Sequence, residues 1–128
     1  MHKILLVDDS PTILSSMVGI LESAGYATVK APDADSALAK IRGGLSPALV
    51  ITDYHMPGMN GVQLIQELRK LQSTRFTPML VLTTESQQEK RDEARSAGAT
   101  GWLVKPVQAD QLLQVVRQVA PATQVRAA

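Results

Sequence analysis

The feature that most constrains the fold of this chain is a regular alternation of short apolar runs with longer segments whose apolar residues recur at helical spacing. Most of the runs lack polar alternation, which is typical of strands covered on both faces. Because runs and helical segments alternate along the whole chain, the sequence predicts an α/β fold, with a parallel sheet between two layers of helices. The predicted strands cover residues 4–7, 27–31, 48–52, 79–83 and 101–104.

Residues that favour helix ends lie at the boundaries of the helical segments. Ser10 is suited to cap the first helix, Pro11 fits its first position, and Gly25 fits its end. Asp33 is suited to cap the second helix. These signals support the predicted order of elements.

The fourth helical segment, residues 86–97, differs from the others because Ala94 and Ala97 are its only apolar residues. A helix that is polar nearly all round is weakly anchored to the rest of a protein. The sequence therefore predicts that this helix is the element most able to shift.

Length and composition limit the classes of function. The 128 residues fit one compact domain, which we expect over residues 1–120, with a flexible tail over 121–128. A net charge of +1 without a long basic block gives no electrostatic footprint for a nucleic-acid partner. The chain has no cysteine, which is compatible with a reducing cytoplasm, and its first apolar run is too short for a signal peptide or membrane span. We expect a soluble cytoplasmic monomer.

Residues with reactive or charged side chains lie at the predicted carboxyl ends of the strands. Asp8 and Asp9 follow the first strand, Asp53 follows the third, Thr83 ends the fourth, and Lys105 follows the fifth. Ligands of open α/β sheets bind outside these ends, at the point where the strand order reverses. In the flavodoxin-like order 2-1-3-4-5, the first and third strands adjoin at that point, and the three carboxylates would share one crevice.

Three neighbouring carboxylates repel one another, and a hard divalent cation relieves that repulsion. Mg²⁺ prefers oxygen ligands and keeps several waters, so a few acids are sufficient to hold it. Lys105 and the Thr83 hydroxyl then suit an anion on the opposite side of the crevice. A metal, a lysine and a hydroxyl together indicate phosphoryl transfer.

Four segments at strand ends carry a family resemblance when they are taken in order. They read LLVDDS at 5–10, TDYHMPGMNG at 52–61, LTTE at 82–85, and AGA at 97–99 followed by GWLVKP at 101–106. With these segments the chain resembles the receiver domains of two-component response regulators, and most of all the CheY-like type of chemotaxis. The resemblance covers about residues 3–119 and implies a flavodoxin-like (βα)5 doubly wound sheet.

The resemblance implies roles for the acidic residues. Asp53 is expected to accept the phosphoryl group. Asp9 is expected to bind Mg²⁺ directly and Asp8 largely through water, with the backbone carbonyl of His55 as a further ligand. Asp53 itself completes the metal site.

The resemblance also implies roles for residues of the fourth and fifth strands. Lys105 is expected to pair with the phosphoryl oxygens and Thr83 to donate a hydrogen bond to them. Trp102 stands where the family has its switch aromatic. The Lys105–Pro106 peptide is expected to be cis, as in the family, because a cis bond before proline costs little.

Two residues are expected to set the lifetime of the phosphorylated aspartate. By the resemblance, His55 and Glu85 flank the approach of the hydrolytic water. We expect Glu85→Ala to slow hydrolysis, whereas the sign for His55 is open because its side chain can crowd the water or hydrogen-bond it. The chain departs from the family at His55 and at Val107, where Phe is common.

The predicted function is a signalling switch, not an enzyme, that receives its phosphoryl group from a histidine kinase of the CheA type. Its signal is expected to leave through the surface formed by the fourth helix, the fifth strand and the last helix. The target is open between a flagellar motor switch, another component of a kinase pathway, and none at all, if the protein drains phosphate.

Other functions fit the residues less well. A Mg²⁺-dependent phosphatase with an aspartate nucleophile usually needs a second acid at position 55, where this chain has His55. A flavin-binding module needs a phosphate-binding loop after the first strand, where Asp8 and Asp9 repel phosphate. A zinc site at His2 and His55 lacks the required number of ligands.

Overall fold

The computed structural model describes residues 3–84 and 88–119, which form a five-stranded parallel sheet flanked by helices. The sheet has the order β2-β1-β3-β4-β5, which confirms the predicted flavodoxin-like topology. Its strands are β1 (Lys3–Val7), β2 (Ala27–Ala31), β3 (Leu49–Asp53), β4 (Met79–Thr83) and β5 (Gly101–Val104).

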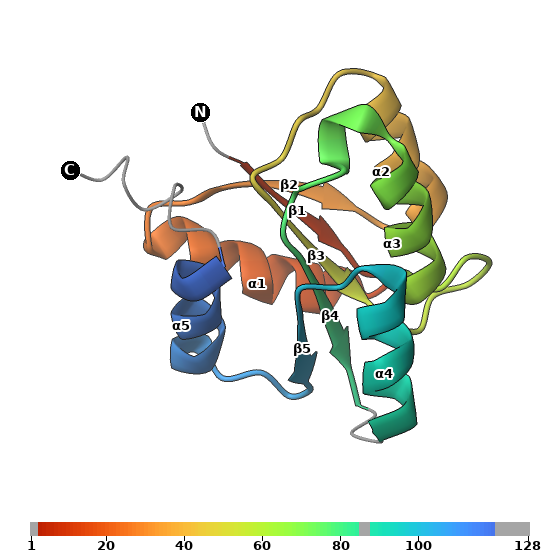
Figure 1. Ribbon diagram of the computed structural model, residues 1–128. Coiled ribbons are helices and arrows are strands. Elements are labelled where there is room, and N and C mark those ends of the chain that lie inside the picture. Colours follow the sequence, from red (N-terminus) through yellow and green to blue (C-terminus); the bar gives the residue numbers. More distant parts are fainter. Residues whose placement is uncertain (1–2, 85–87, 120–128) are drawn as a thin grey trace.

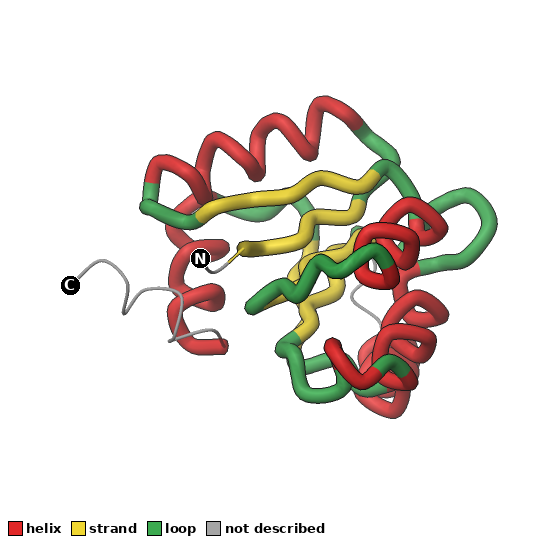
Figure 2. The backbone as a smooth tube through the Cα atoms, turned by 90° about the horizontal axis from the view of Figure 1, so that it is seen from above, coloured by secondary structure: helices red, strands yellow, loops and turns green. Residues whose placement is uncertain are grey.

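Helices cover both faces of the sheet (Figure 1). On one face lie α1 (Pro11–Ser23) and α5 (Ala109–Val119). On the other lie α2 (Ala34–Arg42), α3 (Gly61–Lys70) and α4 (Gln88–Ala97). A short 3₁₀ helix, η1 (Gln72–Thr74), follows α3. The view from above shows the twisted strands between the two layers of helices (Figure 2).

Two apolar clusters fill the space between the sheet and its helices. Side chains alternate between the faces of a strand, so Leu5 and Val7 pack toward α2 and α3, while Ile4 and Leu6 pack toward α1 and α5. The three central strands are buried on both faces, as the uninterrupted apolar runs predict, whereas the edge strands β2 and β5 are only partly buried. The central strands therefore give the site a rigid base.

The predicted helix caps are confirmed. The Ser10 side chain accepts a hydrogen bond from the Ile13 backbone N–H at 3.3 Å. The Asp33 side chain accepts one from the Ser36 N–H at 2.7 Å. Gly25 follows the end of α1 with a φ of 96°, a left-handed conformation that favours glycine.

Two of the predicted strands differ from the structure by one residue, because β1 already starts at Lys3 and β3 covers Leu49–Asp53. The third strand ends at Asp53 and not at Thr52, because Asp53 still pairs with Leu82 of β4. The end of β3 matters most, because the strand itself fixes the backbone of Asp53.

Arg69 binds the loops that precede β4 and β5, at the amino end of these strands. The sequence did not predict these contacts. Its guanidinium donates hydrogen bonds to the Thr74, Arg75 and Thr77 carbonyls at 3.1, 2.9 and 2.6 Å. It also reaches the Gly98 carbonyl, just beyond α4, at 3.1 and 2.7 Å from two of its nitrogens. The side chain thereby ties the end of α4 to α3.

The Lys105–Pro106 peptide is cis, as the family resemblance implied. It lies directly after β5 and starts the connection to α5. Among the helices in residues 3–84 and 88–119, none combines the length and apolar character that crossing a membrane would require.

Candidate functional site

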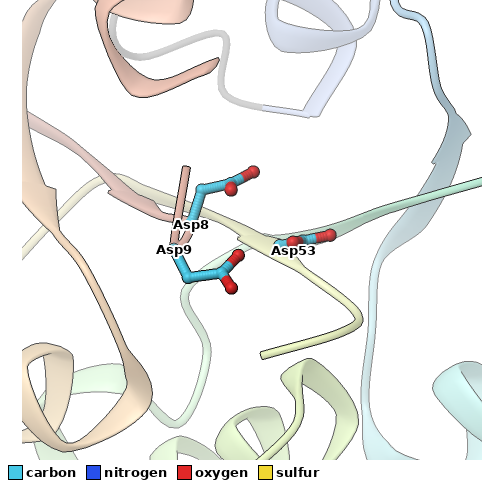
Figure 3. A group of neighbouring side chains, drawn as sticks. All are labelled: Asp8, Asp9 and Asp53. Atoms are coloured by element: carbon cyan, nitrogen blue, oxygen red, sulfur yellow. The ribbon is translucent and has the colours of Figure 1, made fainter. Parts of the chain in front are cut away.

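Three carboxylates meet at the carboxyl end of the sheet, as the sequence predicts. Val7 of β1 is opposite Thr52 of β3, so the residues that follow each of them lie at the same level. One carboxylate oxygen each of Asp8, Asp9 and Asp53 lies within 4.8 Å of the others (Figure 3). The adjoining central strands bring together side chains that are 45 residues apart in the sequence.

The three acids differ in burial. Asp8 is 2% exposed and Asp53 6%, whereas Asp9 is exposed. One Asp8 oxygen accepts a hydrogen bond from the Ser10 backbone N–H at 2.9 Å, at the start of α1. No hydrogen bond from the described residues reaches the Asp9 carboxylate, so its oxygens remain available to a ligand in solvent.

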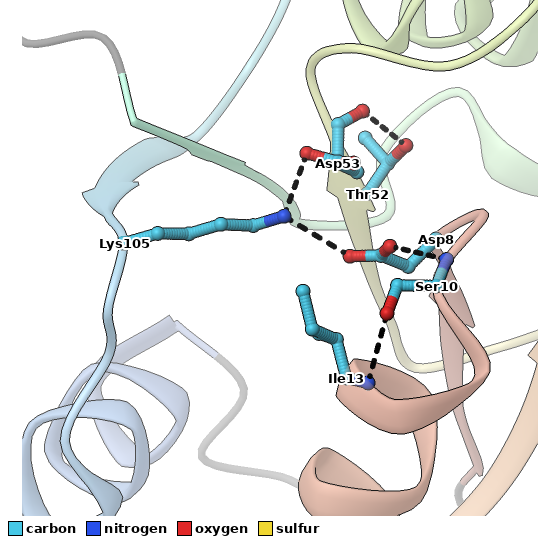
Figure 4. Close-up of polar contacts among 6 residues, drawn as sticks. All are labelled: Asp8, Ser10, Ile13, Thr52, Asp53 and Lys105. Atoms are coloured by element: carbon cyan, nitrogen blue, oxygen red, sulfur yellow. Dashed lines mark hydrogen bonds and ion pairs between the residues drawn. The ribbon is translucent and has the colours of Figure 1, made fainter.

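Lys105 reaches the cluster from the loop after β5 (Figure 4). Its Nζ lies 3.0 Å from Asp53 Oδ1 and 3.3 Å from Asp8 Oδ2. Three ionised carboxylates and one ammonium leave two negative charges uncompensated. A divalent cation with oxygen ligands matches both the charge and the chemistry of this donor set.

Burial and charge perturb the groups of this cluster. Burial raises the pKa of Asp53 above its ordinary value of 3.8, the Asp8 and Asp9 charges act in the same direction, and Lys105 only partly offsets them. Burial alone would lower the pKa of Lys105, but its contacts with Asp53 and Asp8 outweigh that effect and raise it. The Lys105 ammonium therefore stays charged, whereas ionisation of Asp53 beside the two other carboxylates is unfavourable.

Of the remaining predicted residues, Thr83 and His55 lie beside this cluster. Thr83 is 1% exposed at the end of β4, one residue beyond the partner of Asp53 in the sheet. His55 is exposed and lines a hollow of about 310 Å³ beside Asp9. Trp102 is half-buried in β5. Glu85 lies outside the described residues.

Tyr54 is a residue whose role the sequence did not reveal. It directly follows Asp53 and is only 3% exposed. Its hydroxyl donates a hydrogen bond to Glu93 Oε1 at 2.5 Å and lies 3.2 Å from Lys90 Nζ. Burial and the bond to Glu93 raise the pKa of Tyr54, so the hydroxyl stays protonated and can donate. A large aromatic residue after a buried strand was the only signal in the sequence.

Comparison with known proteins assigns the family. A family model described as the response regulator receiver domain matches residues 4–117. The chain belongs to this family. Receiver domains take a phosphoryl group from histidine kinases, act on downstream targets as signalling switches and generally bind Mg²⁺ at an acidic pocket.

Relatives of this receiver match it along nearly its whole length. Protein PilH of Pseudomonas aeruginosa is 34% identical over 119 residues, which cover 93% of this chain and 98% of PilH. Chemotaxis protein CheY of the same organism is 34% identical over 118 residues, covering 91% of this chain and 94% of CheY. The solved structure of CheY4 of Vibrio cholerae superposes with a TM-score of 0.89 at 40% identity, covering 93% of this chain and 98% of CheY4.

Proposed function

We propose that this receiver is a stand-alone response regulator that accepts a phosphoryl group on Asp53 in a Mg²⁺-dependent reaction and signals by changing shape. The observation that carries the proposal is the contact of Lys105 with a buried Asp53 carboxylate that has two further acids within 4.8 Å. The chain covers PilH and CheY to 98% and 94% of their own lengths, which supports the comparison with these two regulators.

The contacts of the acids favour Asp53 as the acceptor. One Asp8 oxygen is bound by Ser10 and the other by Lys105. Only Oδ1 of Asp53 is bound by Lys105, and its second oxygen receives no hydrogen bond from the described residues. Every buried side-chain oxygen in the described residues has a hydrogen-bond partner. Since the second oxygen of Asp53 has none, it is open to solvent. It can therefore attack an incoming phosphorus.

The metal would lie on the Asp9 side of the cluster. Asp9, whose carboxylate has no hydrogen bond from the described residues, is the candidate for direct binding, while Asp8 would contribute largely through water. Asp53 and the His55 backbone carbonyl would complete the site. When bound, Mg²⁺ would supply positive charge to the phosphoryl oxygens.

Residues of the chain would hold the transferred group. As the bond between the donor nitrogen and phosphorus breaks, a bond forms from the Asp53 carboxylate oxygen to phosphorus, and the donor imidazole leaves. Lys105 would pair with the negatively charged phosphoryl oxygens, and the Thr83 hydroxyl would donate a hydrogen bond to one of them. His55 and Glu85 would then set how quickly water removes the group.

A pocket beside the site is suited to the phosphodonor. It has a volume of about 420 Å³, is mainly apolar and lies between α1 and the start of α5. Lys105 and Val107 are part of its lining. Val is smaller than the Phe common at this position in the family, so the pocket has more room for a docking histidine kinase of the CheA type.

The output would pass through Thr83 and Trp102 to the face formed by α4, β5 and α5. If Thr83 turns toward a phosphoryl group, the Trp102 ring gains room to move inward. A hollow of about 210 Å³ on this face is lined by Arg91, Arg95 and Trp102 among others. Chemotaxis is the pathway we propose, because CheY of Pseudomonas aeruginosa and CheY-3 of Vibrio cholerae carry that name at 34% identity, the same value as for PilH.

Incubation with acetyl phosphate and Mg²⁺ tests the proposal. One phosphoryl group should be added, detected by intact mass, and EDTA or the substitution Asp53→Ala should abolish it. Asp35→Ala is the matched control, because Asp35 is an exposed carboxylate on α2 outside the site. A label that persists in Asp53→Ala would show that another residue is the acceptor.

A further inference from the structure

The helix α4 has almost no apolar attachment to the rest of the protein. Of its residues Gln88–Ala97, only Ala94 is buried. The prediction of a weak apolar anchor is therefore confirmed, yet the helix still has a defined position. Among residues 3–84 and 88–119, polar contacts attach the helix at its far end and at its middle.

The first contact is at the far end of the helix, where Arg69 binds the Gly98 carbonyl. The second involves the middle of the helix and the residue next to the proposed acceptor. The Tyr54 hydroxyl donates to Glu93 at 2.5 Å and lies 3.2 Å from the Lys90 ammonium. The same ammonium lies 5.1 Å from the centre of the Tyr54 ring, within the range of a cation–π contact.

The backbone of Tyr54 is held firmly on the site side. Its N–H donates to the Leu82 carbonyl at 2.8 Å, and its carbonyl accepts from the Gly61 N–H at 2.8 Å. A Cβ at Gly61 would lie 2.2 Å from the Asp53 carbonyl oxygen, so α3 packs directly on this part of the chain. These contacts fix the Tyr54 backbone, so the side chain is the part of this residue that is able to move.

The Tyr54 ring is also in contact with the proposed switch residue. The ring centres of Tyr54 and Trp102 are 6.1 Å apart, with an edge-on arrangement. A Trp102 side chain that moves inward would press on a ring whose other end is bonded to α4. The Tyr54 side chain thus contacts both Trp102 of β5 and Glu93 of α4.

The geometry points to Tyr54 as the positioning residue that couples phosphorylation of Asp53 to the position of α4. This inference rests on the proposed function. The Tyr54 hydroxyl holds α4 in the resting position through Glu93 and Lys90, and inward movement of Trp102 breaks that attachment. Because the attachment belongs to the resting state alone, its removal shifts the population toward the phosphorylated arrangement.

Amide hydrogen exchange of the unphosphorylated protein tests the attachment. Tyr54→Phe keeps the ring and removes only the hydroxyl, and exchange in residues 88–97 should become about tenfold faster, as expected for a charge-assisted hydrogen bond. Tyr26→Phe is the matched control, since Tyr26 is a buried tyrosine in the other apolar cluster. Unchanged exchange in α4, or equally faster exchange throughout the protein, would overturn the inference.

The rate of labelling by acetyl phosphate tests the coupling, which a merely structural residue would not affect. Tyr54→Phe should be labelled several-fold faster than the parent protein. Glu93→Gln retains an acceptor for the hydroxyl, so its labelling rate should lie between those of the parent and Tyr54→Phe. Glu89→Gln is the control, because Glu89 is an exposed residue of the same helix. A Tyr54→Phe protein with faster α4 exchange but the parental labelling rate would refute the coupling.

The two readouts separate this inference from the proposed function. If the parent protein takes no label at Asp53, the proposed function is wrong and the coupling fails with it. The exchange rates still decide, in that case, whether Tyr54 attaches α4 to β3. If the parent is labelled normally and Tyr54→Phe behaves like Tyr26→Phe in both measurements, only the coupling is wrong.

Discussion

Replacing Asp53 by asparagine should stabilise the metal-free protein, although it removes an ion pair. Asp53 has one favourable neighbour, Lys105 at 3.0 Å, and two acidic neighbours within 4.8 Å. At an effective dielectric constant of about 20, unit charges attract by about 5.5 kcal/mol at 3.0 Å and repel by about 3.5 kcal/mol at 4.8 Å. The two repulsions together exceed the attraction by about 1.5 kcal/mol.

Two corrections to this balance have opposite signs. Asp9 is exposed, so solvent weakens its repulsion. Asp53 is only 6% exposed, so ionisation also costs solvation energy, in line with the raised pKa of its carboxyl. We therefore expect Asp53→Asn to raise the free energy of unfolding by about 1–2 kcal/mol and the midpoint of thermal unfolding by about 4 °C.

Thermal unfolding in EDTA measures this effect, with Asp35→Asn as an exposed control that should leave the midpoint nearly unchanged. Because the folded-state pKa of Asp53 is raised above 3.8, protonation of Asp53 favours the folded state. The difference between the two proteins should thus be absent below that ordinary value and grow as the pH rises through the raised pKa. Added Mg²⁺ should stabilise the parent more than Asp53→Asn, since the variant lacks a ligand charge.

Three outcomes would refute this reasoning. An Asp53→Asn protein that is less stable than the parent in EDTA near neutral pH would show that the Lys105 ion pair outweighs the repulsion. A stability difference that is larger in acid would reverse the inferred direction of the pKa shift. Equal stabilisation of both proteins by Mg²⁺ would place the metal away from Asp53.

Substitutions of Lys105, of the two acids before α1 and of Arg69 should each have a measurable effect. Lys105→Met should destabilise the metal-free protein by about 3 kcal/mol in urea unfolding, because two buried carboxylates lose their counter-ion; unchanged stability would refute that pairing. Asp9→Ala should cost more Mg²⁺ affinity than Asp8→Ala in a fluorescence titration, and equal or reversed losses would contradict the assignment of the direct ligand. Arg69→Lys should cost about 2 kcal/mol, since a lysine cannot reproduce five hydrogen bonds to four carbonyls.

The architecture of this receiver could be predicted because its signals are local. Uninterrupted apolar runs identified β1, β3 and β4, and the caps at Ser10 and Asp33 fixed the starts of α1 and α2. The parallel sheet follows from the alternation of strands and helices, and its order was confirmed. The end of β3 was misplaced by one residue, because a charged side chain looks like a loop residue even where it pairs within a sheet.

The acidic cluster could be predicted because strand ends converge in a parallel sheet. Once β1 and β3 are neighbours, Asp8, Asp9 and Asp53 have to lie close together. Lys105 follows β5, which is separated from β3 by β4, and its long side chain reaches the cluster from the same edge of the sheet. What the sequence could not give is the difference between the acids. Burial of Asp8 and exposure of Asp9 depend on how α1 starts, where the Ser10 N–H takes one oxygen of Asp8.

The attachment of α4 was beyond sequence reasoning for a different reason. Its contacts join residues far apart in the sequence, 39 positions for Tyr54 and Glu93 and 29 for Arg69 and Gly98, and no periodicity connects them. When only apolar spacing is considered, a helix with one buried alanine is predicted to have almost no attachment to the rest of the protein. Polar contacts to a buried tyrosine hold it instead, and such contacts can be exchanged at a small net cost because water replaces them. A helix attached in this way has a defined resting position and can still leave it, which is what an output element of a switch requires.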